Sequence, residues 1–138
     1  MKSFEELNCW KKAASLRRKI SILVKTFPRE EKYRLVDQMI RSSRSAPAQI
    51  AEGFGRFHFQ ENIQFCRQAR GSLFELIDHL ITSQEEKYIS DETFLDVRNE
   101  IDDCLSLLNG YINYLVKAKS SSKVEEPSGV YARLTDND

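Results

Sequence analysis

Three arginines that can bind phosphate lie in one short segment, RSSRSAPAQIAEGFGR, which covers residues 41–56. A guanidinium group binds phosphate through two hydrogen bonds at once, and such contacts give a nucleic-acid affinity that falls as salt rises. Arg41, Arg44 and Arg56 are therefore candidate phosphate contacts. Arg44 and Arg56 lie off the apolar face of the predicted helix, and a structural role stays equally open for both. For Arg41 we favour a structural role.

A structural polar seam is predicted between this helix and the next one along the chain. Its members are Gln38, Arg41, Ser45, Glu52, Ser72 and Glu75. Spacings of three, four and seven residues put the first four on one side of a helix, beside its apolar residues. Arg41 is expected to pair there with Glu75 or Glu52. A glycine inside a helix costs about 1 kcal/mol relative to alanine, so Gly71 is expected to allow either a close helix approach or an open pocket in compensation.

A second basic cluster lies on the solvent side of the first predicted helix. It consists of Lys11, Lys12, Arg17, Arg18 and Lys19. Together with Arg44 and Arg56, this cluster makes up the predicted nucleic-acid-binding set. Taken alone, the cluster is more simply interpreted as a solvated helix face. Repetition around a homo-oligomer multiplies the field and the valency of a modest patch, which favours nucleic-acid binding.

Metal and cofactor chemistry is not indicated by the sequence. A di-metal site in a helical bundle uses Glu-x-x-His pairs, but the third residue after Glu75 is Asp78, and His79 comes one place late. Gly53-Phe54-Gly55 is half of a dinucleotide fingerprint and follows a helix where a strand is required. We predict no catalytic residue, no bound metal and no cofactor, and we expect the protein not to be an enzyme.

The three cysteines are interpreted as core residues. Cys9, Cys66 and Cys104 lie far apart and lack the paired spacing of a disulfide framework or a zinc site. Each falls on the apolar face of a predicted helix, where cysteine behaves as a small hydrophobic residue. We expect them to pack and not to react.

Apolar residues recur every three or four positions in four long segments. This pattern predicts an all-α fold, an up-down-up-down four-helix bundle. The bundle is expected to cover residues 1–119. From residue 120 to residue 138 the pattern gives way to turn formers and mixed charge, which predicts a mobile C-terminal tail.

The helix boundaries follow from capping signals. Ser3 and Glu6 have capping-box spacing, so the first helix is expected to begin there. Pro28 is expected to stop that helix and to begin the second, because proline is tolerated in a first helical turn. The third helix is expected from about His58 to Glu86, with His58 at or near its cap. Ser90 is expected to cap the fourth.

Proline and glycine predict an irregular second helix. Pro47 removes an amide donor and clashes with the carbonyl of Ser43, which predicts a bend or a loose turn that nearby serine hydroxyls can stabilise. Gly53 and Gly55 are expected to form the C-terminal end of this helix and the turn that follows it.

The net charge of zero hides an asymmetry along the chain. Residues 1–70 carry 15 Lys and Arg against 7 Asp and Glu, whereas residues 71–138 carry 6 against 14. Such asymmetry fits either a surface for an anionic partner or basic and acidic helices that lie side by side in the fold, and we favour the second interpretation.

Composition predicts a soluble protein without a membrane partner. Hydrophobic residues make up 41% and charged residues 30% of the chain. No apolar run approaches the roughly 18 residues that a membrane span needs. The start, MKSFEELNCWKK, lacks the apolar core of a secretory signal, so a cytoplasmic location is expected.

The same segments carry a resemblance to a known family. The matching residues are Phe4, Leu7, Trp10, Phe27-Pro28, Glu31, Gln38-Met39-Ile40-Arg41, Ser45-Ala46-Pro47, Ile50-Ala51-Glu52-Gly53, Arg56, Gly71-Ser72 and Glu75. Through them the chain resembles, over about residues 3–118, the four-helix-bundle proteins encoded in intervening sequences of bacterial large-subunit ribosomal RNA genes. Gln49 stands where relatives usually have asparagine before Ile-Ala-Glu-Gly.

The resemblance implies a set of partners. Members of this family are similar to the accessory protein of diversity-generating retroelements, which forms a homopentameric ring with a basic surface and acts with a reverse transcriptase. The resemblance thus implies a homo-oligomer, with a pentamer as the expected form, and no known enzymatic activity. It also implies RNA or DNA and a protein such as a reverse transcriptase as partners.

Two functions are compatible with these residues. The first is a non-enzymatic homo-oligomeric bundle that binds nucleic acid through a basic surface, and it is the function we favour. The alternative is a protein-interaction scaffold without nucleic-acid binding, in which basic helices of one copy meet acidic helices of the next.

Overall fold

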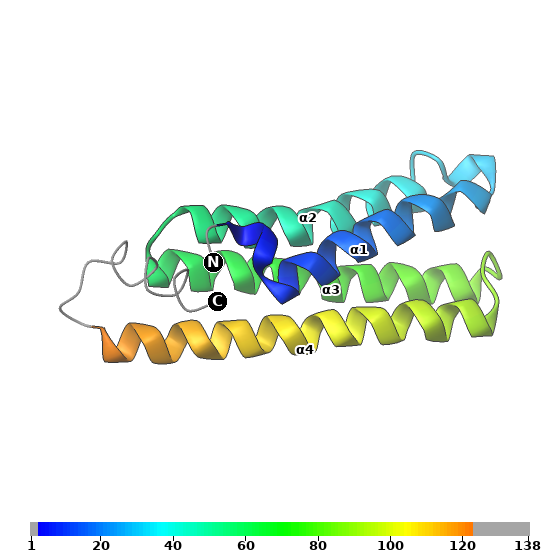
Figure 1. Cartoon of the computed structure of the whole chain (residues 1–138). Coiled ribbons are helices and arrows are strands. Elements are labelled where there is room, and N and C mark those ends of the chain that lie inside the picture. The colour runs from blue at the N-terminus through cyan, green and yellow to red at the C-terminus, as the bar shows by residue number, and fades with distance from the viewer. Residues whose placement is uncertain (1–2, 123–138) are drawn as a thin grey trace.

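The computed structural model describes residues 3–122 and contains four long helices that run alternately up and down (Figure 1). Their bounds are α1 (Asn8–Leu23), α2 (Leu35–Gly55), α3 (Phe59–Glu85) and α4 (Asp91–Ser121). Helix α2 packs against α1 and α3, and α4 packs against α3 and α1, so each helix has two main neighbours. The described residues form no strand. The predicted all-α four-helix bundle is confirmed.

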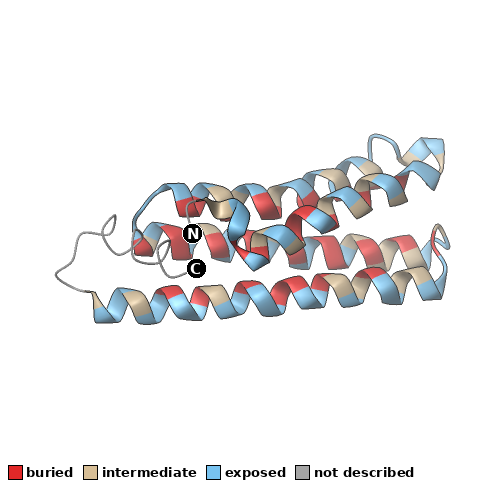
Figure 2. Ribbon diagram, in the orientation of Figure 1, coloured by how far each residue is buried: buried red, intermediate tan, exposed pale blue. Residues whose placement is uncertain are grey.

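The core runs along the axis of the bundle, where the inward faces of all four helices meet (Figure 2). The largest side chains in it are Leu16, Ile20, Met39, Ile50, Leu73, Leu76, Leu80, Ile101, Leu108 and Leu115. Burying one such side chain contributes roughly 1.5–3 kcal/mol. The helices therefore owe their stability mainly to packing, and their outward faces are free to vary.

The first α-helix begins later than the capping box predicts. Ser3 instead caps a short 3-10 helix, η1 (Phe4–Glu6), and its Oγ accepts a hydrogen bond from the amide of Glu5 at 3.1 Å. Leu7 then adopts an extended backbone and turns its side chain into the core. Burying the Leu7 side chain stabilises the protein more than one further turn of helix would, so α1 starts at Asn8.

The second α-helix also begins later than expected. Pro28 precedes only a 3-10 helix, η3 (Arg29–Glu31), and α2 starts at Leu35. The Tyr88 hydroxyl donates a hydrogen bond to Glu31 at 2.8 Å, and its ring packs on Phe27 with the centroids 5.3 Å apart. These contacts with the α3–α4 connection hold the α1–α2 connection in its own conformation.

The other predicted caps are confirmed. Nδ1 of His58 accepts a hydrogen bond from the amide of Glu61 at 3.4 Å, and Oγ of Ser90 accepts one from the amide of Thr93 at 3.0 Å. Helix α4 continues to Ser121, so the first two residues of the predicted tail are helical. The rest of the predicted tail, from residue 123 onward, lies outside the described residues.

Helix α2 is not interrupted at its proline. It stays helical through Pro47, whose ring is buried, so no loose turn forms. Pro47 leaves the backbone carbonyl of Ser43 without its usual amide donor. The Ser43 hydroxyl forms its hydrogen bond elsewhere, because its Oγ donates to the carbonyl of Ile40 at 3.0 Å. The ring fills core space, which compensates for the missing hydrogen bond.

The close helix approach occurs at a different glycine from the one predicted. A Cβ built on Gly53 would lie 2.7 Å from Oδ1 of Asn62 and 2.9 Å from Cβ of Phe65, both on α3. A Cβ on Gly71 would meet nothing within 4 Å. Gly53 therefore lets α2 and α3 approach each other, whereas Gly71 faces outward and the prediction for it is wrong.

Candidate functional site

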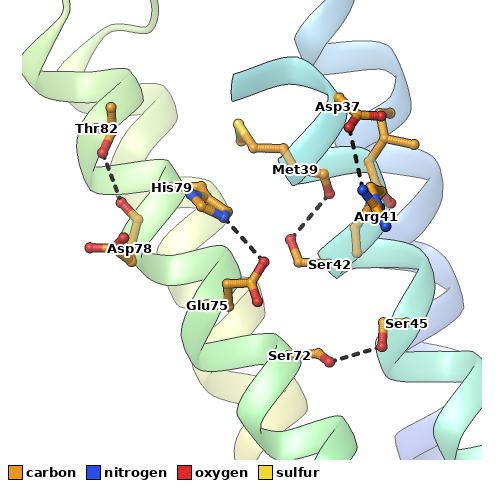
Figure 3. A network of polar contacts seen from close by, with 12 residues as sticks. Asp37, Met39, Arg41, Ser42, Ser45, Ser72, Glu75, Asp78, His79 and Thr82 are labelled. Atoms are coloured by element: carbon orange, nitrogen blue, oxygen red, sulfur yellow. Dashed lines mark hydrogen bonds and ion pairs between the residues drawn. The ribbon is translucent and has the colours of Figure 1, made fainter. Parts of the chain in front are cut away.

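A polar hollow of about 410 Å³ opens between α2 and α3 (Figure 3). The residues that line it are Gln38, Arg41, Ser42, Ser45, Ser72 and Glu75. Oγ of Ser72 donates to Oγ of Ser45 at 3.0 Å and links the two helices. The structure thus brings most of the predicted polar seam together and adds Ser42, which the predicted seam did not include.

Two members of the predicted seam have other partners. Nη1 of Arg41 lies 3.7 Å from Oδ2 of Asp37, one turn back on α2, and the Arg41 side chain is 77% exposed. Glu52 lies further along α2, where Oε1 is 3.3 Å from Nη2 of Arg56. The expected pairing of Arg41 with Glu75 or Glu52 is therefore absent among the described contacts.

Glu75 is held by a histidine of its own helix. Nε2 of His79 lies 3.2 Å from Oε2 of Glu75, and the His79 side chain is only 12% exposed. Figure 3 shows this pair on the α3 wall of the hollow, opposite Ser42 and Arg41. The hollow therefore has the Glu75 carboxylate on its α3 side, the exposed Arg41 guanidinium on its α2 side, and serine hydroxyls between them.

Gln49 supplies a buried polar atom near the same helix interface. Its Oε1 is enclosed and has no hydrogen-bond partner among the described residues. An unpaired buried oxygen of this kind costs about 1–3 kcal/mol. This unfavourable oxygen belongs to position 49, where relatives in the family that the chain resembles usually have the shorter asparagine.

The structure divides the predicted nucleic-acid-binding residues into two groups. In the first group each cation has a neighbour in the chain. Nζ of Lys12 and Nζ of Lys19 lie 3.9 Å and 2.8 Å from the carboxylate of Glu100 on α4. Arg17 stacks over Trp10 with its Cζ 5.9 Å from the ring centroid. The two lysines thus join α1 to α4, whereas Arg17 contacts its own helix.

Arg56 belongs to the same group. It pairs with Glu52, and its Cζ lies 5.1 Å from the ring centroid of Phe65. Exposed ion pairs contribute at most about 1 kcal/mol, so such pairs can exchange for a phosphate.

The second group consists of Lys11, Arg18 and Arg44. All three are exposed, and no acidic side chain within residues 3–122 pairs with them. Lys11 and Arg18 are seven residues apart on the outward face of α1, and Lys25 repeats the spacing in η2 (Val24–Thr26). Sequence reasoning missed Lys25, although its seven-residue spacing was visible.

A metal site and a reactive thiol each place requirements on the described residues. Residues 3–122 contain no group of three or more His, Cys, Asp or Glu side chains that could hold a metal ion. Burial raises the pKa of the Cys9 thiol to about 11 and the pKa values of the Cys66 and Cys104 thiols to about 12. All three cysteines are therefore neutral at physiological pH. No described helix has the combined length and apolar character that a membrane span needs.

The fold and these surfaces define an all-α four-helix bundle with a polar α2–α3 seam and a basic outward face on α1. The model of the 23S rRNA-intervening sequence protein family matches residues 5–110. The chain belongs to this family, as its sequence resemblance predicts. No curated protein matches the chain.

Proposed function

We propose that this protein is a non-enzymatic homo-oligomer that binds RNA or DNA through the basic outward face of α1 and through Arg44 on α2. In line with the family resemblance, the proposed assembly is a pentamer in the cytoplasm that acts with a protein partner such as a reverse transcriptase. The observation that carries the proposal is that the exposed cations Lys11 and Arg18 on α1 and Arg44 on α2 have no acidic partner among the described residues.

These cations suit a polyanion because of where they lie. Lys11, Arg18 and Lys25 follow one another at intervals of seven residues, which is about 10.5 Å along a helix. Each unpaired ammonium or guanidinium group can neutralise one phosphate and release a counterion. Several copies in one assembly present several such rows at once, so weak single contacts add up to useful affinity.

The test is a salt titration of nucleic-acid binding by fluorescence anisotropy, with labelled single-stranded and duplex RNA and DNA of mixed sequence. The variant Lys11→Glu/Arg18→Glu/Arg44→Glu is compared with Lys117→Glu, which changes an exposed lysine on α4. We expect the triple variant to lose most of its affinity and to lower the slope of log K against log salt by about 0.9 per lost phosphate contact. The Lys117 variant should bind as the parent does.

One observation weighs against nucleic-acid binding by α1 and so leaves room for the alternative scaffold function: Lys12 and Lys19 pair with Glu100 within the chain. This pairing shows that basic and acidic helices already neutralise each other within one chain. If no nucleic acid binds at low salt while the protein still self-associates, the scaffold function replaces the proposed one.

A further inference from the structure

Tyr33 is the most exposed large hydrophobic side chain in the described part of the chain, at 83%. It lies in the α1–α2 connection, residues 24–34, two residues before α2 begins. The same connection buries Phe27, which is only 8% exposed. The Tyr33 ring therefore adds almost nothing to the core. A single exposed ring is common on protein surfaces, so its neighbours decide what it can do.

The neighbours of Tyr33 in the connection are cations. Nζ of Lys32 lies 5.4 Å from the centroid of the Tyr33 ring, and Arg34 follows directly in the chain. Three aromatic rings in the described residues have a cation over them, and Tyr33 is the only exposed one of the three. An open aromatic face and an ammonium group are thus presented to solvent together.

The connection carries more free positive charge than Lys32 alone. Four of its basic side chains are exposed and have no ion-pair partner within residues 3–122, namely Lys25, Arg29, Lys32 and Arg34. Charges that no acid of the chain neutralises can each bind a phosphate and release a counterion.

The two acids of the connection belong to a different contact. Glu31 accepts the hydrogen bond of the Tyr88 hydroxyl at 2.8 Å. The negative charges of Glu31 and Glu30, with that of Glu86, raise the pKa of the same hydroxyl. Both acids of the connection therefore lie near Tyr88 and the α3–α4 connection, and neither pairs with the basic side chains around Tyr33.

The basic row of α1 leads to this connection. Exposed residues recur there at alternating spacings of four and three: Lys11, Ser15, Arg18, Ile22 and Lys25. Figure 1 shows that α1 runs directly into the α1–α2 connection, which contains Tyr33. Ile22 is 66% exposed between two cations of the row. Such an apolar side chain gains nothing from a phosphate but can contact a base or a sugar.

An aromatic ring among free cations is the arrangement that suits a single strand. Unpaired bases expose their flat faces, and every base has a face on which an aromatic ring can stack. In a duplex those faces are covered by the neighbouring base pairs, and the outside presents mainly phosphates. Cations that follow the backbone, together with a ring that stacks, give binding with little sequence preference.

We propose that Tyr33 stacks on an unpaired base of a single-stranded nucleic acid, while Lys32 and Arg34 bind the phosphates on either side of that base. The α1 row then contacts phosphates further along the strand. This inference rests on the nucleic-acid binding of the proposed function and deepens it, because it names single strands as the ligand. It does not depend on the number of copies in the assembly.

The first test compares variants of Tyr33 by fluorescence anisotropy with a labelled single strand of mixed sequence at low salt. We expect Tyr33→Ala to weaken binding by about fivefold or more, the loss typical of one stacked base, and Tyr33→Phe to bind as the parent does. Tyr114→Ala is the matched control, since Tyr114 is an exposed tyrosine on α4, and it should leave the affinity unchanged. Circular dichroism checks that each variant keeps the helical fold.

Salt dependence separates the ring from the cations. Tyr33→Ala removes no charge, so it should lower the affinity at every salt concentration without changing the slope of log K against log salt. Lys32→Gln/Arg34→Gln should lower that slope by about 0.7 per lost phosphate contact on a single strand. A flatter slope for Tyr33→Ala would overturn the stacking role, because it would show that the substitution disturbs phosphate contacts.

An abasic strand tests the base contact itself. This strand keeps the sugar–phosphate chain and lacks the bases, so the parent should bind it about fivefold or more weakly than the normal strand. Tyr33→Ala should bind the two strands alike, and it should bind a duplex of the same sequence as well as the parent does. Equal losses on the normal strand, the abasic strand and the duplex would overturn stacking on a base.

The remaining outcomes separate this inference from the function on which it rests. A parent that binds nucleic acid together with a Tyr33→Ala variant of equal affinity for single strands would overturn the role of Tyr33 alone. A parent that binds no nucleic acid at low salt would overturn the proposed function as well. A change in mass on sedimentation of Tyr33→Ala would place the ring between copies of the chain and overturn its role as a base contact.

Discussion

Oγ of Ser72 on α3 donates a hydrogen bond to Oγ of Ser45 on α2 at 3.0 Å, and this pair closes one end of the polar hollow. The bond joins residues that are 27 positions apart in the sequence. A second hydrogen bond between the two helices runs from Oγ of Ser83 to Sδ of Met39 at 3.4 Å, and apolar side chains pack around both.

A double-mutant cycle measures this link. Ser45→Ala and Ser72→Ala each leave one hydroxyl with one partner fewer, so each should destabilise the protein by about 1 kcal/mol. The double variant should lose less than the sum of the two, by about 0.5–1 kcal/mol, because neither hydroxyl then remains to lack a partner. Urea unfolding followed by circular dichroism gives the four free energies, and strict additivity would show that the hydroxyls do not interact.

Gly53→Ala should destabilise the bundle, because its Cβ would lie 2.7 Å from Oδ1 of Asn62 and 2.9 Å from Cβ of Phe65. Overpacking of this kind costs about 1–3 kcal/mol. Gly55→Ala is the matched control on the same helix, since a Cβ there meets nothing within 4 Å. The midpoint of thermal unfolding should fall for the first variant and hold or rise for the second, and equal midpoints would contradict a close approach at Gly53.

The Tyr88–Glu31 hydrogen bond predicts a change of stability at alkaline pH. The bond raises the pKa of Tyr88 to about 12, because ionisation would remove the donated proton and place two anions together. Since the pKa of an unfolded tyrosine is about 10, this stabilisation is complete below that value and is lost as pH rises toward the folded pKa.

The measurement is the free energy of unfolding of the parent and of Tyr88→Phe between neutral pH and strongly alkaline pH. The parent should be the more stable at neutral pH, and its advantage should shrink between about pH 10 and pH 12. A constant difference across this range would show that the hydrogen bond does not control the titration.

The three buried cysteines should be unreactive in the folded protein. Burial raises the pKa of each thiol, to about 11 for Cys9 and about 12 for Cys66 and Cys104. A rise of two pKa units or more lowers the thiolate fraction by about a hundredfold or more, and the thiolate is the reactive form. Labelling with Ellman's reagent at pH 8 should be slow in buffer and rapid in denaturant. Rapid labelling of one thiol in buffer would place that residue outside the core.

Some boundaries could be predicted because their cause is local. Ser90 and His58 cap their helices through amides three residues ahead, so short sequence windows contain all the information. The starts of α1 and α2 could not be predicted in this way. Leu7 leaves helical conformation to reach the core, and Glu31 is held by Tyr88, which lies 57 residues further along the chain.

In the candidate site, too, local features could be predicted and contacts between distant residues could not. Residue spacing placed Gln38, Arg41 and Ser45 on one side of α2, and the structure shows them around one hollow. Residue spacing could not predict the ion-pair partners of the basic side chains. Arg41 pairs with Asp37, and Lys19 pairs with Glu100 on α4. Long charged side chains choose among several neighbours, and the choice depends on distances between helices.

The sequence by itself determined four helices, their inward faces and the family, because apolar spacing and short motifs are local properties of the chain. Only the tertiary structure decided which glycine serves packing and which cations lack an acidic partner among the described residues. Gly53 lies against α3, whereas Gly71 and Gly110 face outward. The physical reason is that contact between helices depends on their rotation and separation, which packing of the whole core sets at once.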